Sequence, residues 1–284
     1  MSTEILNKNG KLYLVATPIG NLEDITLRAL NTLKEVDLIA AEDTRHTLGL
    51  LNHFEISKPL ISYYKQTEKK KSNILIEKLL EGKNIALVSD AGTPGISDPG
   101  EEIVKKAIEK GIQIIPIPGC VAFVNGLISS GLNTREFVFF GFLPANLTDK
   151  RKKLEDIKYE KKTLIFYEAP HKLKVSLENI LEILGDRNIV LAKELTKIHE
   201  QFIRGKISTV LGQIVDNIKG EFVIIVEGSE KSEKEFQVES LNELSLEEHF
   251  DYYKNQGLDK KEIIKRIAKD RNVSKNDIYK YFFN

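Results

Sequence analysis

The chain has 284 residues, of which 41% are hydrophobic and 30% charged, and its formal net charge at pH 7 is zero. This length allows one large domain or two to three ordinary ones with a sizeable core, and the composition excludes a disordered chain. The zero net charge excludes a globally basic protein, so any surface for an anionic polymer must be local.

Cysteine and histidine are too sparse for a disulfide framework or a structural metal site. The chain has one cysteine, Cys120, and five scattered histidines without the spacing of a zinc site. No stretch approaches the roughly 20 apolar residues of a membrane span, and the N-terminus lacks the pattern of an export signal. We therefore expect a soluble, cytoplasmic protein without a resident metal.

The first predicted strand, residues 12–16, ends in a turn over residues 17–21 that contains Pro18 and Gly20. A helical pattern resumes at Leu27. The turn contains neither Gly-Lys-Ser/Thr nor Gly-x-Gly-x-x-Gly, which disfavours a phosphate cradle of either known kind.

A second apolar segment, residues 36–41, leads directly into the cluster Glu42-Asp43-Thr44-Arg45-His46. Ionisable groups at the carboxyl end of a strand are typical of a site, although acids at a helix start also complement the helix dipole. The guanidinium of Arg45 can grip a phosphate in a forked geometry, so Arg45 is the first candidate for such a contact. A short strand follows at residues 60–63.

The next predicted strand, residues 85–88, is apolar throughout, as in strands buried on both faces of a parallel sheet. The loop that follows, residues 90–100, contains three glycines, two prolines and two aspartates. Strand-to-helix connections usually take about 2–6 residues, so this loop is longer than a connection requires. Glycines expose backbone groups and carboxylates accept hydrogen bonds, so we interpret it as a ligand loop at the sheet edge where α/β folds bind ligands. The alternative is a strand-to-helix turn with Asx caps.

Strands and helices alternate up to residue 118, which predicts a first domain, residues 1–118, with a parallel sheet and crossover helices. Its last strand, residues 113–117, contains Pro116 and therefore belongs at an edge. A second domain, residues 119–229, begins with a helix, and we expect a mixed sheet there. Its predicted strands are residues 137–142, 163–167, 188–193 and 221–227, with a basic helix at 149–158 and another helix at 171–184.

The end of the chain is predicted to be helical. Residues 229–240 are charged and without periodicity, so we interpret them as a linker. A helical module follows at residues 240–284, with capping-box patterns at Asp259 and Ser274 that are typical of short helices. Lysines and arginines, among them Lys265 and Lys275, outnumber acids there. This excess indicates either contact with nucleic acid or a small helical cap with solvated lysines.

Five segments together resemble a known family. They are residues 13–22, 41–45, 87–100, 139–144 and 166–171. As a set they are similar to the bacterial 16S ribosomal RNA cytidine 2'-O-methyltransferases of the tetrapyrrole methylase superfamily, and the similarity spans residues 11–228. Where the pigment-forming relatives carry Gly-Asp-Pro, this chain has Gly92-Thr93-Pro94, which points to the RNA branch.

The resemblance implies two α/β domains with S-adenosylmethionine in the cleft between them, commonly in a homodimer, and 16S ribosomal RNA in the small subunit as substrate. The cofactor contacts that it implies are Pro18, Asp90, Ala91, Gly92, Thr93, Ile96, Val121, Ala122, Tyr167 and Glu168. The chemistry of these residues is consistent with contacts to this cofactor. Bare backbone near Gly92 suits the methionine ammonium and carboxylate, and the apolar side chains suit an adenine face.

Methyl transfer to a ribose hydroxyl is a single in-line displacement, in which positioning alone can supply up to roughly 7–11 kcal/mol. A base helps, because an alcohol is a poor nucleophile until its proton leaves. The candidates for the base are Glu42, Asp43, Lys193, Glu194 and His171. We expect Glu42 or Asp43 to orient the nucleotide, and the RNA contacts to come from Arg45, His171, Lys193, Lys265 and Lys275.

Two alternatives stay open at this point. One is a tetrapyrrole or corrinoid C-methyltransferase that uses the same cleft, which the basic C-terminal helices disfavour. The other is a non-catalytic RNA-binding assembly factor that retains the fold, and a failure to bind S-adenosylmethionine would favour it.

Overall fold

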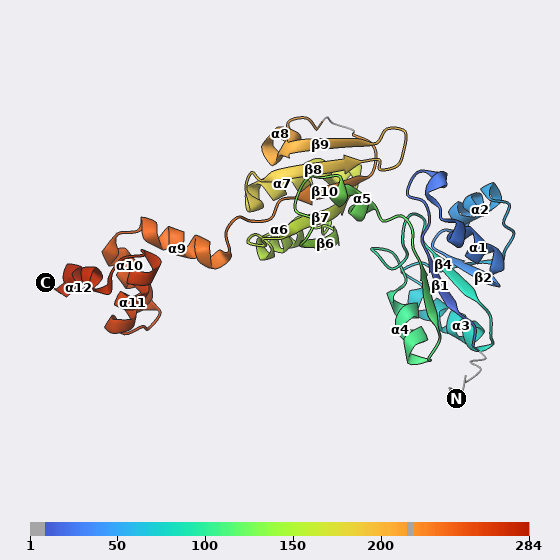
Figure 1. The fold of residues 1–284 in the computed structure, drawn as a ribbon, viewed down its shortest axis with the longest axis horizontal. Helices are drawn as coiled ribbons and strands as arrows, with labels where there is room; N and C mark the ends of the chain where they lie inside the picture. The colour runs from blue at the N-terminus through green and yellow to red at the C-terminus, as the bar shows by residue number, and fades with distance from the viewer. Residues whose placement is uncertain (1–8, 215–217, 284) are drawn as a thin grey trace.

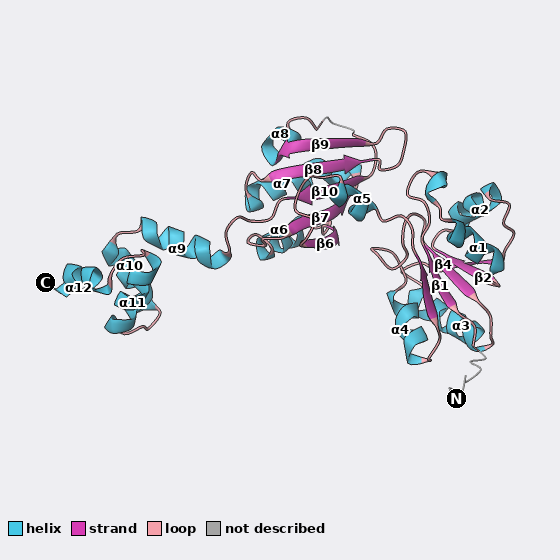
Figure 2. Cartoon of the chain, viewed as in Figure 1, coloured by secondary structure: helices cyan, strands magenta, loops and turns pink. Residues whose placement is uncertain are grey.

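The computed structural model describes residues 9–214 and 218–283. These residues form two α/β lobes and a C-terminal helical module, which follow one another along the long axis of the molecule (Figure 1). Each lobe is built on its own sheet, whereas the module is entirely helical (Figure 2). Within the described ranges, no helix is long and apolar enough to cross a membrane.

The first lobe contains a parallel sheet with strand order β3-β2-β4-β1-β5. Its strands are β1 (Leu12–Val15), β2 (Leu38–Ala41), β3 (Leu60–Ser62), β4 (Ile85–Val88) and β5 (Ile114–Ile117). The central strands β2 and β4 are buried at every position, as their unbroken apolar sequences predict. Strand β5, which carries Pro116, lies at the edge, so that prediction is confirmed.

Helices cover both faces of this sheet. They are α1 (Leu27–Glu35), α2 (Thr44–His53), α3 (Glu68–Leu80) and α4 (Glu101–Glu109), with a short 3-10 helix at Leu22–Asp24. Leu33 of α1 and Leu51 of α2 pack into the core on one face, and Leu75 of α3 and Ile103 of α4 pack into the core on the other. All four side chains are almost completely buried.

The second lobe contains a sheet with strand order β6-β7-β10-β8-β9. Its strands are β6 (Phe137–Phe142), β7 (Thr163–Glu168), β8 (Asn188–Lys193), β9 (Gln201–Lys206) and β10 (Phe222–Val226). Strands β6 and β7 are parallel and the other neighbours are antiparallel, so the predicted mixed sheet is confirmed. Its helices are α5 (Ala122–Ile128), α6 (Leu147–Asp156), α7 (Pro170–Leu184) and α8 (Ile207–Leu211). Strand β9 and helix α8 differ from the expected elements, because an edge strand with polar residues at both ends lacks a clear strand pattern.

The C-terminal module corrects one prediction. Residues 229–240 are not a linker, because α9 (Glu233–Glu243) begins there with a capping box between Ser232 and Glu235. The helix lacks an apolar stripe, and Leu241 is its one buried residue among those described. The next helices, α10 (Leu246–Asn255), α11 (Lys260–Asp270) and α12 (Lys275–Phe283), share a small core around Ile263 and Ile267.

Two glycines test how tightly the first lobe is packed. A Cβ at Gly119, just after β5, would lie 2.7 Å from the Cβ of Ala16, whereas a Cβ at Gly49 in α2 would meet nothing within 4 Å. We expect Gly119→Ala to destabilise the fold by about 1–3 kcal/mol through overpacking. Gly49→Ala is the matched control and should stabilise it by about 0.5–1 kcal/mol, because alanine favours a helix interior. Urea unfolding measures the free energy of unfolding of both variants. Changes of the same sign in the two variants would contradict this view of the packing.

Candidate functional site

A cavity of about 580 Å³ lies between the two lobes. The first lobe contributes residues that follow β1, β2 and β4, and the second contributes the carboxyl ends of β6, β7 and β8, the beginning of β10 and the start of α5. The volume falls in the range of small-molecule sites. The sheet edge predicted to bind a ligand therefore faces a real cavity.

The long loop after β4 is held in place by hydrogen bonds to the turn after β1. Thr17 and Gly92 exchange two backbone hydrogen bonds, with N–O distances of 2.8 and 3.1 Å. Gly92 has a φ of +85°, which a side chain would strain, and its N–H and C=O are both engaged. The N–H and C=O of Gly92 itself are therefore used within the protein, and the expectation that backbone near Gly92 meets the cofactor stays a prediction. The hydroxyl of Thr93 donates to the carbonyl of Cys120 at 3.1 Å, which ties the loop to the segment that enters the second lobe.

Three carboxylates from the first lobe line the cavity: Glu42, Asp90 and Asp98. Asp90 accepts a hydrogen bond from the backbone N–H of Asp43 at 2.9 Å. Burial, reinforced by the negative charges of Asp98 and Asp90, raises the pKa of Glu42 to about 7. Burial and the charge of Asp90 raise the pKa of Asp98 to about 6, against an opposing hydrogen bond from Ser89. Glu42 is therefore poised to accept a proton near neutral pH.

The pKa of the neighbouring Asp43 is lowered, whereas that of Glu42 is raised. It is the N-cap of α2, and its carboxylate forms a salt bridge with the guanidinium of Arg45 at 2.7 Å. Hydrogen bonds from Arg45 lower the pKa of Asp43 to about 2. The Arg45 side chain is 90% exposed, and neither residue lines the cavity.

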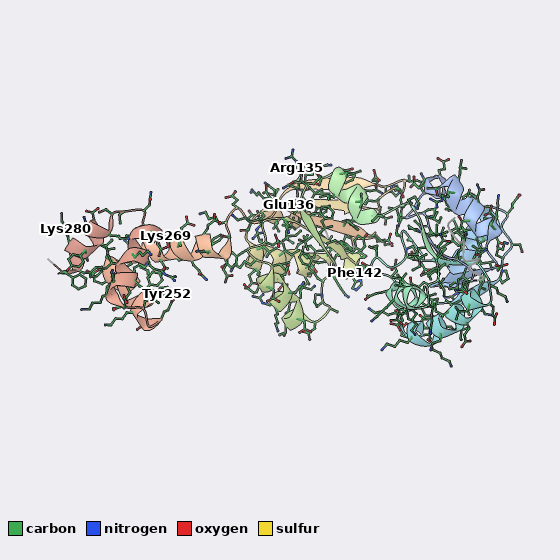
Figure 3. All side chains as sticks on the ribbon, turned by 60° about the horizontal axis from the view of Figure 1, so that its bottom comes forward. Arg135, Glu136, Phe142, Tyr252, Lys269 and Lys280 are labelled. Atoms are coloured by element: carbon green, nitrogen blue, oxygen red, sulfur yellow. The ribbon has the colours of Figure 1, made fainter. Side chains whose placement is uncertain are left out.

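The structure gathers most of the sequence-predicted site residues around this cavity. Those that line it are Glu42, Asp90, Ala91, Gly92, Thr93, Ile96, Val121, Ala122, Tyr167, Glu168 and His171. Pro18 is buried and does not line the cavity, although its neighbour Ile19 does. Lys193 lies at the end of β8, next to the lining residue Ala192. Lys265 and Lys275 lie in α11 and α12, the region marked by Lys269 and Lys280 in Figure 3.

Glu168 forms part of the wall, but its carboxylate points into the protein. Its Oε1 accepts the N–H of Ala169 at 2.9 Å, and its Oε2 accepts the hydroxyl of Ser176 at 2.5 Å. The ammonium of Lys150, on the basic helix α6, donates to the same hydroxyl at 2.8 Å and lies 4.0 Å from Oε2. Both charged side chains are almost fully buried, and burial lowers the pKa of Lys150 despite the charge of Glu168. The start of α7 is thereby fixed beside the cavity.

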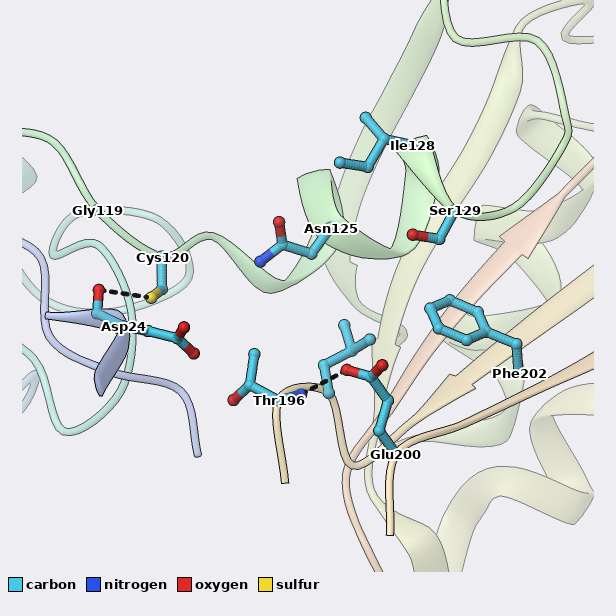
Figure 4. Close-up of a pocket in the computed structure, with 10 residues that line it drawn as sticks. Asp24, Gly119, Cys120, Asn125, Ile128, Ser129, Thr196, Glu200 and Phe202 are labelled. Atoms are coloured by element: carbon cyan, nitrogen blue, oxygen red, sulfur yellow. Dashed lines mark hydrogen bonds between the residues drawn. The ribbon is translucent and has the colours of Figure 1, made fainter. Parts of the chain in front are cut away.

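A second cavity, of about 460 Å³, lies near the segment that joins the two lobes (Figure 4). Charged, polar and apolar residues line it, among them Asp24, Glu200 and Phe202. Glu200 accepts the N–H of Thr196 at 2.7 Å, and the Cys120 thiol donates to the carbonyl of Asp24. No residue predicted from the sequence to form the site lines it. Among the described residues, no group of three or more His, Cys, Asp or Glu could hold a metal ion.

Phe142, which no sequence pattern singles out, lines the main cavity and is 57% exposed. It belongs to a segment that carries the family resemblance, residues 139–144, but strand alternation alone does not place its ring in the cavity.

The buried pair gives a prediction about stability. Lys150→Met leaves the carboxylate of Glu168 buried without its cation, so we expect a loss of about 3–5 kcal/mol. Lys152→Met is the control, because Lys152 is exposed on the same helix and its change should stay within about 0.5 kcal/mol. Thermal unfolding of the two variants compares them, and equal melting temperatures would show that the pair contributes nothing.

Comparison with known proteins identifies the family of the chain. Residues 11–211 match the family described as Tetrapyrrole (Corrin/Porphyrin) Methylases. The protein called ribosomal RNA small subunit methyltransferase I is 52% identical in Halalkalibacterium halodurans, over 96% of this chain and 94% of that protein. Its namesake in Bacillus subtilis is 50% identical over 95% of this chain and 93% of that protein.

Solved structures share the fold at low identity. A diphthine synthase superposes with a TM-score of 0.59 at 16% identity, covering 77% of this chain and 90% of that one. A uroporphyrin-III C-methyltransferase from Thermus thermophilus, complexed with S-adenosyl homocysteine, superposes with a TM-score of 0.55 at 17% identity, covering 76% and 97%. The chain therefore belongs to the tetrapyrrole methylases and, among them, to the family of the ribosomal RNA small subunit methyltransferases I.

Proposed function

We propose that this protein transfers a methyl group from S-adenosylmethionine to the ribose 2'-hydroxyl of a cytidine in the decoding region of 16S ribosomal RNA. The names of its relatives support ribosomal RNA of the small subunit as the substrate. The observation that carries the reaction type is Glu42, a cavity-lining carboxylate whose pKa is raised to about 7. A group of this kind can take the proton of an attacking hydroxyl.

The residues of the main cavity fit the cofactor. Asp90 and Asp98 can accept hydrogen bonds from ribose hydroxyls or from the methionine ammonium, and Ile96, Val121 and Ala122 form an apolar surface for adenine. S-adenosylmethionine supplies an electrophilic methyl group on a positively charged sulfur. Carboxylates near that charge favour the bound cofactor.

The protein's own contribution to catalysis is positioning and proton transfer. The loop fixed by Thr17 and Gly92 holds one wall of the cavity, and Glu168 with Lys150 holds the opposite wall. Such preorganisation keeps the reacting atoms in line. Glu42 accepts the 2'-hydroxyl proton, whereas Asp43, held by its salt bridge, orients Arg45 at the rim.

The RNA extends beyond the cavity in this proposal. His171 at the start of α7, Lys193 and the exposed Arg45 contact the strand near the target, and Lys265 and Lys275 contact phosphates further away. We also propose that the protein acts in the cytoplasm as a homodimer, as the family resemblance implies.

The decisive experiment maps ribose methylation in small-subunit RNA from cells with and without the gene. We expect one cytidine to lose its 2'-O-methyl group in the deletion strain and to regain it with purified protein, S-adenosylmethionine and isolated small subunits. Methylation of a porphyrinoid instead would favour the C-methyltransferase. Binding of RNA without binding of S-adenosylmethionine in calorimetry would favour the assembly factor.

The role of Glu42 predicts a pH dependence. Its carboxyl is protonated below its raised pKa of about 7, so the rate of methyl transfer should rise with pH up to that value and then level off. Glu42→Gln should lower the rate about 10²- to 10⁴-fold and remove the rise. Glu101→Gln, at an exposed acid on α4, is the control and should keep the wild-type profile. An unchanged profile in Glu42→Gln would exclude Glu42 as the base.

A further inference from the structure

The side chains of β6 alternate between the two faces of the second sheet until the strand reaches Gly141. The ring of Phe139 packs against Phe123 and Tyr167, with centroid distances of 4.4 and 4.9 Å. The ring of Phe140 points to the other face, where it stacks on the buried Phe166 at 5.3 Å. Regular alternation would place Phe142 on the same face as Phe140.

A β-bulge reverses this expectation. Phe139 pairs with Ile165 and Phe142 pairs with Tyr167, so β6 has one residue more than β7 between these two pairs. The extra residue is accommodated at Gly141, whose φ of +66° lies in the left-handed region. Bulges of this kind re-aim side chains and often lie next to active sites. Phe142 therefore lies on the Tyr167 face, with the two ring centroids 5.6 Å apart and the ring planes inclined at 64° to each other.

The bulge leaves an apolar ring at the mouth of the cavity. Phe142 is 57% exposed, whereas Phe166, with which it would share a face without the bulge, is completely buried. In Figure 3, Phe142 lies on the side of the second lobe that faces the first. Its contact with Tyr167 supports one edge of the ring, and much of the rest is open.

We propose that Phe142 is a stacking platform for a base of the RNA strand that enters the cavity. This inference rests on the proposed function. Aromatic side chains bind single-stranded RNA by stacking on unpaired bases, and a neutral ring does so without reading the sequence. The position at the exposed rim favours an RNA base over the adenine of the cofactor, for which Val121 and Ala122 offer apolar contacts at the start of α5.

The chain offers a matched control on the same strand. Phe137 begins β6 and is 40% exposed, but it does not line the main cavity. We expect Phe142→Ala to raise the KM for small ribosomal subunits about 5- to 150-fold, the range of one base–aromatic stack, and to leave the Kd for S-adenosylmethionine unchanged. Phe142→Tyr should restore most of the affinity, and Phe137→Ala should behave as the wild type.

A fluorescence experiment reports the contact directly. The sequence contains no tryptophan, so Phe142→Trp introduces a single indole at the mouth of the cavity. Stacking with a base should quench its emission when the RNA that the wild type methylates is added, and S-adenosylmethionine alone should not. Phe137→Trp should respond to neither.

The possible outcomes separate this inference from the proposed function. If the wild type transfers no methyl group to ribosomal RNA, the proposed function fails. If the wild type is active and Phe142→Ala keeps its KM, or Phe142→Trp keeps its emission with RNA, the stacking inference fails alone. A weaker Kd for S-adenosylmethionine in Phe142→Ala would assign the ring to the cofactor and overturn the inference as well.

Discussion

The pair of backbone hydrogen bonds between Thr17 and Gly92 is the constraint on which the rest of the site depends. A loop as long as the one after β4 loses much conformational entropy when it is ordered. The two bonds make the turn after β1 and this loop behave as one element. The bond from Thr93 to Cys120 then extends the connection to the entrance of the second lobe. The cavity is therefore largely formed before any ligand enters, which lowers the cost of binding.

Burial distinguishes two neighbouring acids that look equivalent in the sequence. Glu42 faces two other carboxylates inside the cavity, whereas Asp43 caps a helix and pairs with an exposed arginine. Their pKa values move in opposite directions, to about 7 and about 2. Environments that separate the pKa values of neighbouring acids assign their chemical roles. The sequence alone does not rank these two acids as candidate bases, because it does not show how deeply each side chain is buried.

Much of the fold could be predicted because its signals are local. The apolar run of β4, the proline of β5 and the glycine-rich loop each reflect a constraint on the residues themselves. Helix α9 could not be predicted, because it lacks an apolar face and is held by contacts distant in sequence, such as that between Lys161 and Glu235. Two residues of the candidate site could not be predicted either, because their roles also depend on the surrounding structure. The role of Lys150 depends on a buried partner that leaves no pattern in the sequence. The role of Phe142 depends on a bulge, whose one local sign is a glycine, Gly141, within the strand.

The attachment of α9 has a mechanical consequence. Glu235 forms a 2.7 Å salt bridge with Lys161, and Phe236 packs against Tyr159, so the first turn of the helix lies against the second lobe. Any hinge motion between the lobes would then carry the basic helices together with β6 and β7. A polymer bound at that outlying end would then keep its register with the ring of Phe142, whatever the separation of the two lobes.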